Sequence, residues 1–288
     1  MFVTLQATTR FLQLKRVEVV VLNWNGWRDT LDCIGSLRKL NYSNFGLIVV
    51  DNGSTNESQN QIESHFPDIN VLQTGANLGF GGGCNAGIRR ALEQGADYVW
   101  LINSDATVEA NALNELVRVA DEQALVGAVG SVLYEADQQD LIQLWGGGKV
   151  HFWTGCSRHQ TGRAELDFIS GASLLVRREA LAQVGLFDDQ TFFMYWEDSD
   201  FGFRLRQAGW ALAVAEKSRV WHKLSASLGK GSSQLDAYFT QSGVRFLRRH
   251  SPVPAVSIFM MMVRMLMKRL LMLEFGRVKS VLIGYLQA

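Results

Sequence analysis

Short apolar runs alternate with segments of helical periodicity through the first half of the chain. Residues 17–22 and 47–50 are mostly aliphatic, which is typical of strands buried on both faces. Between them, residues 30–40 carry apolar side chains at helical spacing. The alternation predicts a mostly parallel, Rossmann-like sheet flanked by helices. It adds strands at 69–72, 98–102 and 126–132, and helices at 58–66, 87–94 and 110–122.

The alternation breaks in the second half of the chain. Residues 135–168 are rich in glycine, glutamine and charge, which predicts loops or irregular strands. Further elements follow, with strands at 169–176 and 211–215 and helices at 178–184 and 201–207. We therefore expect one α/β domain at 1–251, made of a half at 17–132 and an elaborated half at 133–251.

Residues 252–288 form an amphipathic helical tail of a different character. The tail is apolar, with the cations Arg264, Lys268 and Arg269 and the acid Glu274. Such a helix suits the surface of an anionic membrane, but it also suits packing on the rest of the chain or at a dimer seam. Cations interrupt each long apolar run, so a membrane-spanning helix is not expected.

Composition limits the classes of partner and the cellular compartment that we expect for the protein. The 288 residues include 28 Lys and Arg and 28 Asp and Glu, so the net charge is zero and nucleic acid is not expected as a partner. The three cysteines are scattered and form no CxxC pair, which favours reduced thiols in a cytoplasm and no zinc site. Residues 1–14 lack the long apolar core of a secretory signal.

Asparagine, aspartate and glycine follow four successive predicted strands. The crevice beyond the carboxyl ends of parallel strands is where such sheets bind ligands. One such loop alone is ordinary turn chemistry, but four together favour a polar binding site. The residues concerned are Asn23, Asn25, Asp51, Asn52, Asn77, Gly79, Asn103 and Asp105.

Two of these acids have chemistry suited to a nucleotide. The carboxylate of Asp51 can accept from a nucleobase N–H or a ribose hydroxyl. Asp105 is a hard oxygen donor suited to Mg²⁺ or Mn²⁺ shared with phosphates, although it also fits a helix cap before residues 107–109.

The glycine-rich segment 79–87, which contains Asn85, matches GxGxxA at residues 81–86. That dinucleotide fingerprint belongs in the first strand-to-helix turn, whereas here the first such turn is at residues 23–26. The glycines therefore let the backbone approach a ligand or let the following helix pack closely. An NAD(P)-linked oxidoreductase is the weaker alternative.

Three acids, Glu197, Asp198 and Asp200, directly follow the aromatic segment 192–196. Carboxylates beside so much apolar surface are costly unless they are paired, bound to a metal or placed at a wet cleft. Such burial also raises a carboxyl pKa toward that of a general base. The alternative is the acidic first turn of a helix. His222, beside Trp221, is by itself either a packed histidine or a ligand.

The ordered motifs resemble glycosyltransferase family 2 over about residues 17–225, in particular its bacterial rhamnosyltransferase branch, whose donor is typically dTDP-L-rhamnose. The segments that carry the resemblance are 23–25, 49–54, 77–87, 103–105, 197–200 with Arg204, 209–210 and His222. The resemblance implies a GT-A fold with a nucleotide-sugar half and an acceptor half. It also implies an inverting transfer to a glycan or lipid-linked saccharide in surface polysaccharide synthesis, in the cytoplasm or peripherally at the inner face of the cell membrane.

The family pattern assigns roles to individual residues. Asp51 would bind the nucleobase or ribose, and Asp105 would hold Mg²⁺ or Mn²⁺ with His222 as a further ligand. Asp198 would be the general base, supported by Glu197 and Asp200. The polar strand ends and Asn85 would line the donor site.

Two positions depart from the family pattern. Asn103 stands at the first position of the DxD motif, and Asn56 stands where the family often has aspartate. These departures keep a non-catalytic nucleotide-sugar-binding protein as an alternative.

Overall fold

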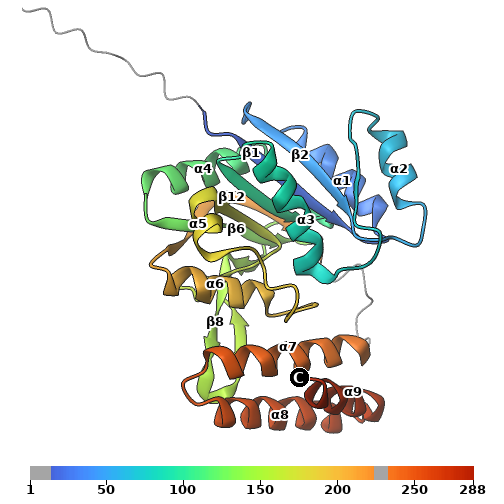
Figure 1. Cartoon of the computed structure of the whole chain (residues 1–288), viewed down its shortest axis with the longest axis vertical. Coiled ribbons are helices and arrows are strands. Elements are labelled where there is room, and N and C mark those ends of the chain that lie inside the picture. Colours follow the sequence, from blue (N-terminus) through green and yellow to red (C-terminus); the bar gives the residue numbers. More distant parts are fainter. Residues whose placement is uncertain (1–13, 224–232) are drawn as a thin grey trace, which may run out of the picture.

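The computed structural model describes residues 14–223 and 233–288. The amino-terminal segment, in which the sequence shows no secretory signal, thus lies almost wholly outside the described residues. The chain is built on a nine-stranded sheet with the order β3-β2-β1-β4-β11-β6-β12-β5, and β7 pairs with β6. Figure 1 labels β1, β2, β6 and β12 of this sheet. Its first half is parallel, as predicted, and consists of β1 (Val17–Asn23), β2 (Phe45–Asp51), β3 (Leu72–Gln73) and β4 (Tyr98–Asn103).

Helices cover both faces of this sheet. On one face, α1 (Trp27–Leu37), α2 (Ser58–His65) and α4 (Ala112–Glu122) pack on the side that carries Val19 and Val21. On the other face, α3 (Gly79–Glu93), α5 (Arg178–Val184) and α6 (Glu197–Gln207) pack on the side that carries Val20. Because successive strand residues point to opposite faces, the nearly continuous aliphatic run at 17–22 supplies both layers. The predicted α/β fold class is confirmed.

The second half of the sheet mixes strand directions. β11 (Ser173–Arg177) lies antiparallel between β4 and β6 (Val126–Glu135), and β6 pairs in parallel with β12 (Ala211–His222). The register of β12 shifts between Ala215 and Arg219, and the strand then continues beyond the predicted end at 215. Its last residues pair antiparallel with β5 (Ala106–Val108), which places His222 opposite Ala106.

This pairing settles one alternative for Asp105. The residues after it form strand β5, so the interpretation of Asp105 as a helix cap is wrong. The reason is tertiary, since β5 is stabilised by β12, which lies about a hundred residues further along the chain.

The segment 135–168 is ordered as strands. β7 (Ile142–Trp145) pairs with β6, while β8 (Gly147–His151) lies between β9 (Cys156–His159) and β10 (Phe168–Ile169) in a small antiparallel sheet. A single turn of 3-10 helix, η1 (Phe152–Thr154), joins β8 to β9. Of the two structures expected for this segment, loops or irregular strands, short strands are confirmed for much of it.

The predicted start of the helix in the glycine-rich segment is wrong, because α3 begins at Gly79 rather than at residue 87. Helix-disfavouring glycines are tolerated here because the helix packs very closely on the sheet. A Cβ atom on Gly83 would lie 2.5 Å from Cδ1 of Leu22, and one on Gly87 would lie 2.3 Å from Cγ1 of Val20. The glycines thus serve helix packing, and the residues that match GxGxxA lie inside a helix rather than in a turn.

The chain ends in three helices, α7 (Ser233–His250), α8 (Pro254–Leu271) and α9 (Phe275–Leu286), which contact one another on one side of the molecule (Figure 1). Trp196, Phe246 and Met261 belong to the apolar cluster that joins them to the rest. Within residues 14–223 and 233–288, no helix is long and apolar enough to cross a membrane. The division into a domain at 1–251 and a tail at 252–288 stays a prediction.

Candidate functional site

Two cavities lie at the carboxyl ends of the parallel strands. The smaller, about 120 Å³, is called here the amide cavity because Asn52, Asn77 and Asn103 line it, together with Gly79 and Asp105. The larger, about 380 Å³, is called the central cavity. Phe80, Asn103, Asp105 and Met194 line both cavities, so the two share a wall. Polar residues that follow β2, β3 and β4 therefore meet in one region.

Asn52 organises the amide cavity. Its Nδ2 donates to the carbonyl of Gly79 at 2.9 Å and to Oδ1 of Asn77 at 3.2 Å, and its Oδ1 accepts from the backbone N–H of Leu78 at 3.1 Å. These contacts join the end of β2 to the start of α3. The backbone of Gly53 has a φ of 71° and a Cβ there would lie 2.4 Å from the carbonyl carbon of Ala76. Only glycine fits that position.

Asp51, Asn23 and Asn25 shape the neighbouring loops. Asp51 is buried, and its Oδ1 accepts from the backbone N–H of Ser54 at 2.7 Å. Asn23 is also buried and donates through Nδ2 to Ser54 Oγ at 3.2 Å. Asn25 accepts through Oδ1 from the backbone N–H of Thr55 at 2.9 Å. None of the three is among the residues that line the two cavities in the described part of the chain.

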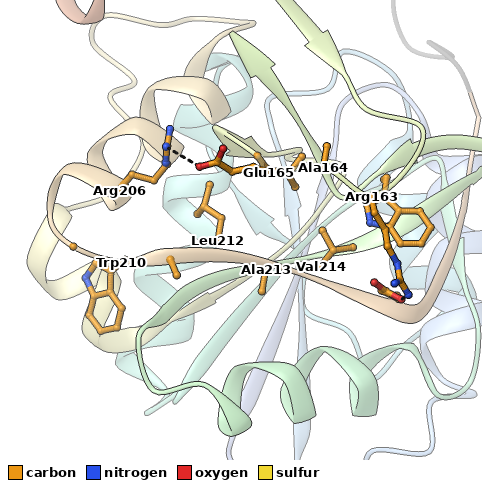
Figure 2. A pocket seen from close by; sticks show the side chains of 13 residues that line it. Arg163, Ala164, Glu165, Arg206, Trp210, Leu212, Ala213 and Val214 are labelled. Carbon is orange, nitrogen blue, oxygen red and sulfur yellow. Dashed lines mark hydrogen bonds and ion pairs between the residues drawn. The ribbon is translucent and has the colours of Figure 1, made fainter.

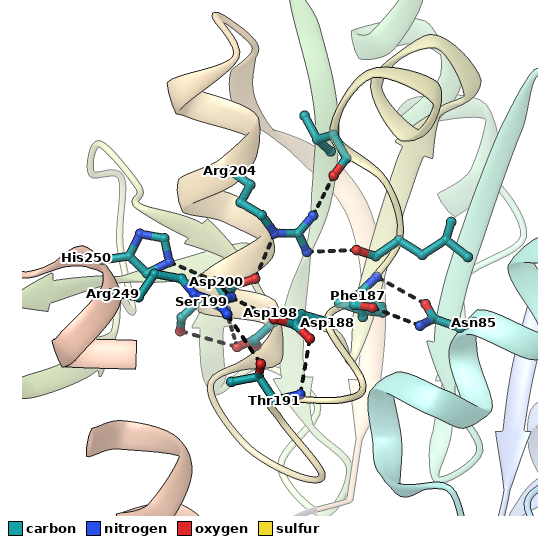
Figure 3. Close-up of polar contacts among 12 residues, drawn as sticks. Asn85, Phe187, Asp188, Thr191, Asp198, Ser199, Asp200, Arg204, Arg249 and His250 are labelled. Atoms are coloured by element: carbon teal, nitrogen blue, oxygen red, sulfur yellow. Dashed lines mark hydrogen bonds and ion pairs between the residues drawn. The ribbon is translucent and has the colours of Figure 1, made fainter. Parts of the chain in front are cut away.

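Asn85 lies outside both cavities. It donates through Nδ2 to the carbonyl of Phe187 at 2.9 Å and accepts from the N–H of Phe187 at 3.1 Å (Figure 3). Its Nδ2 also donates to Oδ2 of Asp189 at 3.0 Å. The structure thus places Asn85 as the anchor that holds the loop before α6 against α3, and not beside the other predicted donor residues.

Asp105 and His222 meet at the boundary of the two cavities. Asp105 Oδ1 lies 3.2 Å from His222 Nε2, and Asn103 Nδ2 also lies 3.2 Å from that nitrogen. On the other side of the ring, His222 Nδ1 lies 2.8 Å from Oε1 of Gln143. The amide of Gln143 is oriented by its own Nε2, which donates to Glu135 Oε2 at 3.2 Å and to the carbonyl of His222 at 3.3 Å.

This arrangement selects one tautomer of His222. Because Gln143 presents an oxygen, Nδ1 must carry the proton in the neutral ring, and Nε2 is left with a lone pair. That lone pair accepts from the amide N–H of Asn103 and lies beside a carboxylate oxygen of Asp105, and a cation bound between the ring and the carboxylate would take the place of this hydrogen bond. Two ligands about 2.1 Å from one ion at a right angle lie about 3 Å apart, close to the observed separation.

The donor set at this point fits Mg²⁺ or Mn²⁺. Carboxylate oxygen and imidazole nitrogen suit Mn²⁺, and Mg²⁺ is typically held by one or two carboxylates together with phosphates and water. Among the described residues there is no group of three or more His, Cys, Asp or Glu side chains placed to hold a metal. Asp105 and His222 would therefore leave most coordination positions to a ligand and to water.

A pair of adjacent acids, Glu197 and Asp198, lines the central cavity. Asp198 Oδ1 accepts from the N–H of Ser199 at 2.6 Å, and its Oδ2 accepts from the N–H of Gly171 at 3.4 Å. Oε2 of Glu197 is buried and has no hydrogen-bond partner in residues 14–223 and 233–288. Helix α6 begins at Glu197, so the helix-start interpretation is confirmed, and it is compatible with a place at the cavity.

Burial changes the acid strength of both carboxyl groups. Burial, and secondarily the charge of Asp198, raises the pKa of Glu197 to about 8. Burial also raises the pKa of Asp198 from its ordinary value, although His159 and the N–H of Gly171 oppose the shift. At neutral pH, Glu197 thus keeps its proton. An ionised carboxylate with a raised pKa is suited to general-base catalysis.

Asp200 lies away from the cavities, in a cluster of cations. Its fully buried carboxylate contacts Arg204 Nε at 2.7 Å, Arg249 Nη1 at 3.0 Å and His250 Nε2 at 2.8 Å (Figure 3). Burial alone would raise the pKa of Asp200, but these contacts, led by the hydrogen bond with His250, outweigh it and lower that pKa. Asp200 therefore fixes α6 to α7 and supports Asp198 only through position.

The residues just before α6 are strained. Tyr195 and Trp196 have φ values of 66° and 68°, a conformation that non-glycine residues rarely adopt. The ring of Trp196 lies 4.9 Å from that of Phe246 and 5.6 Å from that of Phe239, both on α7. Packing against α7 thus holds the turn that presents the acid pair.

Sequence reasoning missed several residues of the site. Gln143 and His159 come from the segment 135–168 that was expected to be irregular, and Gly171 contributes only a backbone N–H. The interruption of the predicted strand at 169–176 is a turn at 170–172. The polar side chains of Gln143 and His159 carry no motif, so only the pairing of β7, β8 and β9 reveals them.

A further cavity of about 770 Å³, larger than either of these two, lies elsewhere. It is lined by residues that include Arg163, Glu165, Arg206 and Trp210 (Figure 2). Its charged side chains pair with one another: Arg206 lies 3.8 Å from Glu165, and Arg163 pairs with Glu216. Ion pairs at an open surface are ordinary structural contacts, so the candidate chemistry lies in the central cavity.

Comparison with solved structures shows the same fold in known sugar transferases. A mannosyltransferase from Pyrobaculum calidifontis, PcManGT, in complex with GDP-Man and Mn²⁺, matches with a TM-score of 0.61 at 16% identity, over 95% of this chain and 74% of that one. GalNAc-T7 with UDP, GalNAc and Mn²⁺ matches with a TM-score of 0.66 at 17% identity, over 82% of this chain and 48% of that one. The expectation of a GT-A fold is confirmed.

Sequence comparison finds relatives of higher identity than these solved structures. An N-acetylglucosaminyl-diphospho-decaprenol L-rhamnosyltransferase of Mycobacterium tuberculosis is 30% identical over 233 residues, 71% of this chain and 75% of the relative. A low-salt glycan biosynthesis hexosyltransferase, Agl10, of Haloferax volcanii is 25% identical over 56% of this chain and 53% of the relative. The family model described as glycosyl transferase family 2 matches residues 18–185, more than half of the chain. The chain belongs to glycosyltransferase family 2.

Proposed function

We propose that this protein is an inverting, divalent-metal-dependent glycosyltransferase that moves L-rhamnose from dTDP-rhamnose to a hydroxyl of a lipid-linked saccharide during bacterial surface polysaccharide synthesis. One observation carries the proposal. The pair Asp105 and His222, which suits a metal, and the acid pair Glu197 and Asp198 line the same cavity of about 380 Å³. The choice of sugar and acceptor is supported by the name of the mycobacterial relative.

The donor would enter at the amide cavity. Asn52 fixes the backbone around Asn77 and Gly79, and Asp105 lines the same cavity. Asp51 is hydrogen-bonded within its own loop. We therefore propose that Asp51 shapes the loop that binds the nucleobase or ribose. Asn103, at the altered position of the DxD motif, contacts His222 and keeps a polar atom at the boundary of the cavities.

Asp105 and His222 would hold Mg²⁺ or Mn²⁺. A divalent ion bound there supplies positive charge to the leaving nucleoside diphosphate. Gln143 keeps the proton of His222 on Nδ1, so that Nε2 keeps a lone pair, which a metal ion would take over from the N–H of Asn103.

Asp198 would be the general base. Its carboxylate takes the proton of the acceptor hydroxyl while that oxygen bonds to the anomeric carbon and the carbon–oxygen bond to the diphosphate breaks. The protonated state of Glu197 leaves Asp198 as the available carboxylate of the pair. One base and one displacement give inversion at the anomeric carbon.

The helices α8 and α9 would place the protein at the inner face of the cell membrane. They expose large apolar side chains, with Phe259 at 64%, Leu271 at 78% and Leu286 at 81% of full exposure. Cations exceed acids in the tail, which favours an anionic lipid surface. Liposome flotation of the full chain tests this proposal, and a homodimer that covers the same face is the competing outcome.

A donor panel tests the proposed activity. We expect thermal stabilisation by dTDP-rhamnose with Mn²⁺, and transfer to an N-acetylglucosaminyl diphospholipid. UDP- and GDP-sugars serve as controls for the base, and a chelator serves as the control for the metal. Stabilisation by nucleotide sugars with neither hydrolysis nor transfer would instead support a non-catalytic binding protein.

A further inference from the structure

A second polar cavity lies among the three carboxy-terminal helices. It measures about 530 Å³ and is called here the basic cavity. Four cations line it and one carboxylate, Asp236, opposes them. The cations are Arg264, Lys268 and Arg269 of α8 and Arg277 of α9.

Two of these cations are fixed in place. Asp236 is buried, with a side chain 7% exposed, and it contacts Arg269 at 2.7 Å and Arg277 at 2.6 Å. Glu274 contacts Arg269 at 2.9 Å and Arg277 at 3.3 Å. Arginine has five N–H donors in a rigid fork, so each guanidinium oriented in this way is a pre-arranged binder for an oxyanion.

Within residues 14–223 and 233–288, the other two cations have no carboxylate partner. The two carboxylates pair with Arg269 and Arg277 rather than with Arg264 or Lys268. Arg264, which also contacts Sγ of Cys156, and Lys268 are exposed and lie four residues apart on α8, hence on one face of the helix. Four cations against Asp236 and Glu274 leave the basic cavity with a net positive charge, which favours an anion with more than one negative group.

The basic cavity adjoins the central cavity. Tyr195 and Leu235 line both of them. Tyr195 stands two residues before Glu197 in the strained turn that presents the acid pair. A molecule whose anionic group sits in the basic cavity can therefore extend past Tyr195 toward Asp198.

The same helices carry apolar surface around the cations. Val263 and Met267 flank Arg264 and Lys268 in sequence and are 39% and 50% exposed. Further along, Leu271 and Leu273 are 78% and 74% exposed. A ligand that matches this surface has an anionic group followed by a hydrocarbon chain, with its other end directed to the central cavity.

We infer that the basic cavity binds the diphosphate of an isoprenoid-linked saccharide acceptor, with the saccharide directed past Tyr195 to Asp198 and the isoprenoid on the exposed apolar face of α8 and α9. This inference rests on the proposed transfer to a lipid-linked saccharide and names the residues that select its diphosphate. In such an acceptor the diphosphate is joined directly to the isoprenoid. This explains why cations and exposed apolar side chains occur together beside the central cavity.

The double variant Arg264→Ala, Lys268→Ala tests the inference by direct binding. Both side chains are exposed, so the variant removes positive charge without disturbing the buried contacts of Asp236. The probe is farnesyl diphosphate, titrated with a chelator present so that it does not bind through a metal at Asp105 and His222. We expect the variant to bind farnesyl diphosphate roughly tenfold more weakly than the wild type. Lys279→Ala, which removes an exposed cation of α9 outside the basic cavity, is the matched control and should not change binding.

Kinetics separate this inference from the proposed function. With an N-acetylglucosaminyl diphospholipid in detergent, the double variant should raise the acceptor KM roughly tenfold and leave the donor KM unchanged. With an alkyl glycoside that lacks the diphosphate, the variant and the wild type should be equal. A wild type that transfers no sugar but binds farnesyl diphosphate through Arg264 and Lys268 contradicts the proposed function and keeps the basic cavity as a diphosphate site.

Membrane lipid is the other source of a phosphate group. Flotation with phosphatidylglycerol vesicles that contain no acceptor distinguishes it. If the double variant loses flotation but keeps the wild-type affinity for farnesyl diphosphate and the wild-type acceptor KM, the cations bind lipid headgroups and the inference is overturned. Equal farnesyl diphosphate binding by the wild type and the double variant also overturns it.

Discussion

Replacing Gln143 with leucine should weaken metal binding without removing a metal ligand. In the wild type, Oε1 of Gln143 lies 2.8 Å from Nδ1 of His222 and holds the proton on that nitrogen. Leucine cannot accept this hydrogen bond, so the ring is free to rotate or to place its proton on Nε2, the atom that faces Asp105. Loss of one such partner of a metal-binding histidine typically weakens metal affinity about 10- to 100-fold.

The expected change corresponds to about 1.4 to 2.7 kcal/mol of metal-binding free energy. The assay is calorimetric titration of Mn²⁺ into the protein with dTDP present, which also reports the number of sites. Gln143 lies in strand β7, and its amide additionally contacts Glu135, so a thermal unfolding curve of the apoprotein controls for local damage.

A double-mutant cycle refutes or supports the reasoning. If Gln143 acts through His222, the leucine substitution should have little effect in a His222→Ala background, because the ring that it orients is gone. The same loss of Mn²⁺ affinity in both backgrounds, or no loss in either, would refute the proposed role of Gln143.

Four other outcomes are expected. Asp198→Asn should lower kcat by about 10²- to 10⁴-fold with donor binding nearly intact. Wild-type turnover by this variant would refute the role of Asp198 as general base. In the wild type, kcat/KM should fall as pH drops through the raised pKa of Asp198, above the ordinary carboxyl range of about 4, because the base is then protonated. Asp200→Asn should cost about 3–5 kcal/mol in denaturant unfolding at pH 7. The pKa of Asp200 is lower in the folded state than in the unfolded state, so its stabilisation should be full above the unfolded pKa and be lost as pH falls through the folded pKa. Parallel curves of unfolding free energy against pH for the wild type and the variant would contradict this. Gly87→Ala should destabilise by about 1–3 kcal/mol through its clash with Val20, whereas Gly35→Ala in α1, with nothing within 4 Å, should not destabilise.

The glycine-rich start of α3 shows where local sequence signals fail. Glycine has low helix propensity, so the sequence predicts a helix only from residue 87. The structure extends it back to Gly79 because Leu22 and Val20 leave no room for side chains on the facing side of the helix. Packing between distant segments outweighs a propensity difference of about 1 kcal/mol per residue.

The segment 135–168 shows the same limit. Its composition resembles loops, yet β7 and β8 form because β6 and β10 offer them hydrogen-bonding edges. Strand formation depends on the partner strand more than on the strand's own residues. The contribution of Gln143 and His159 to the central cavity was therefore beyond sequence-based prediction.

The sequence by itself determined the alternation of strands and helices, the polar ends of the parallel strands and the acid block at 197–200, because periodicity and turn chemistry are written in neighbouring residues. Only the tertiary structure decided which polar groups share a cavity. It pairs Asp105 with His222 through β5 and β12, and it buries Glu197 beside Asp198. It places Asp200 away from them, among the cations of α6 and α7. Burial and charge contacts between distant segments set the pKa values of Glu197, Asp198 and Asp200, and neither is encoded in the spacing of the acids.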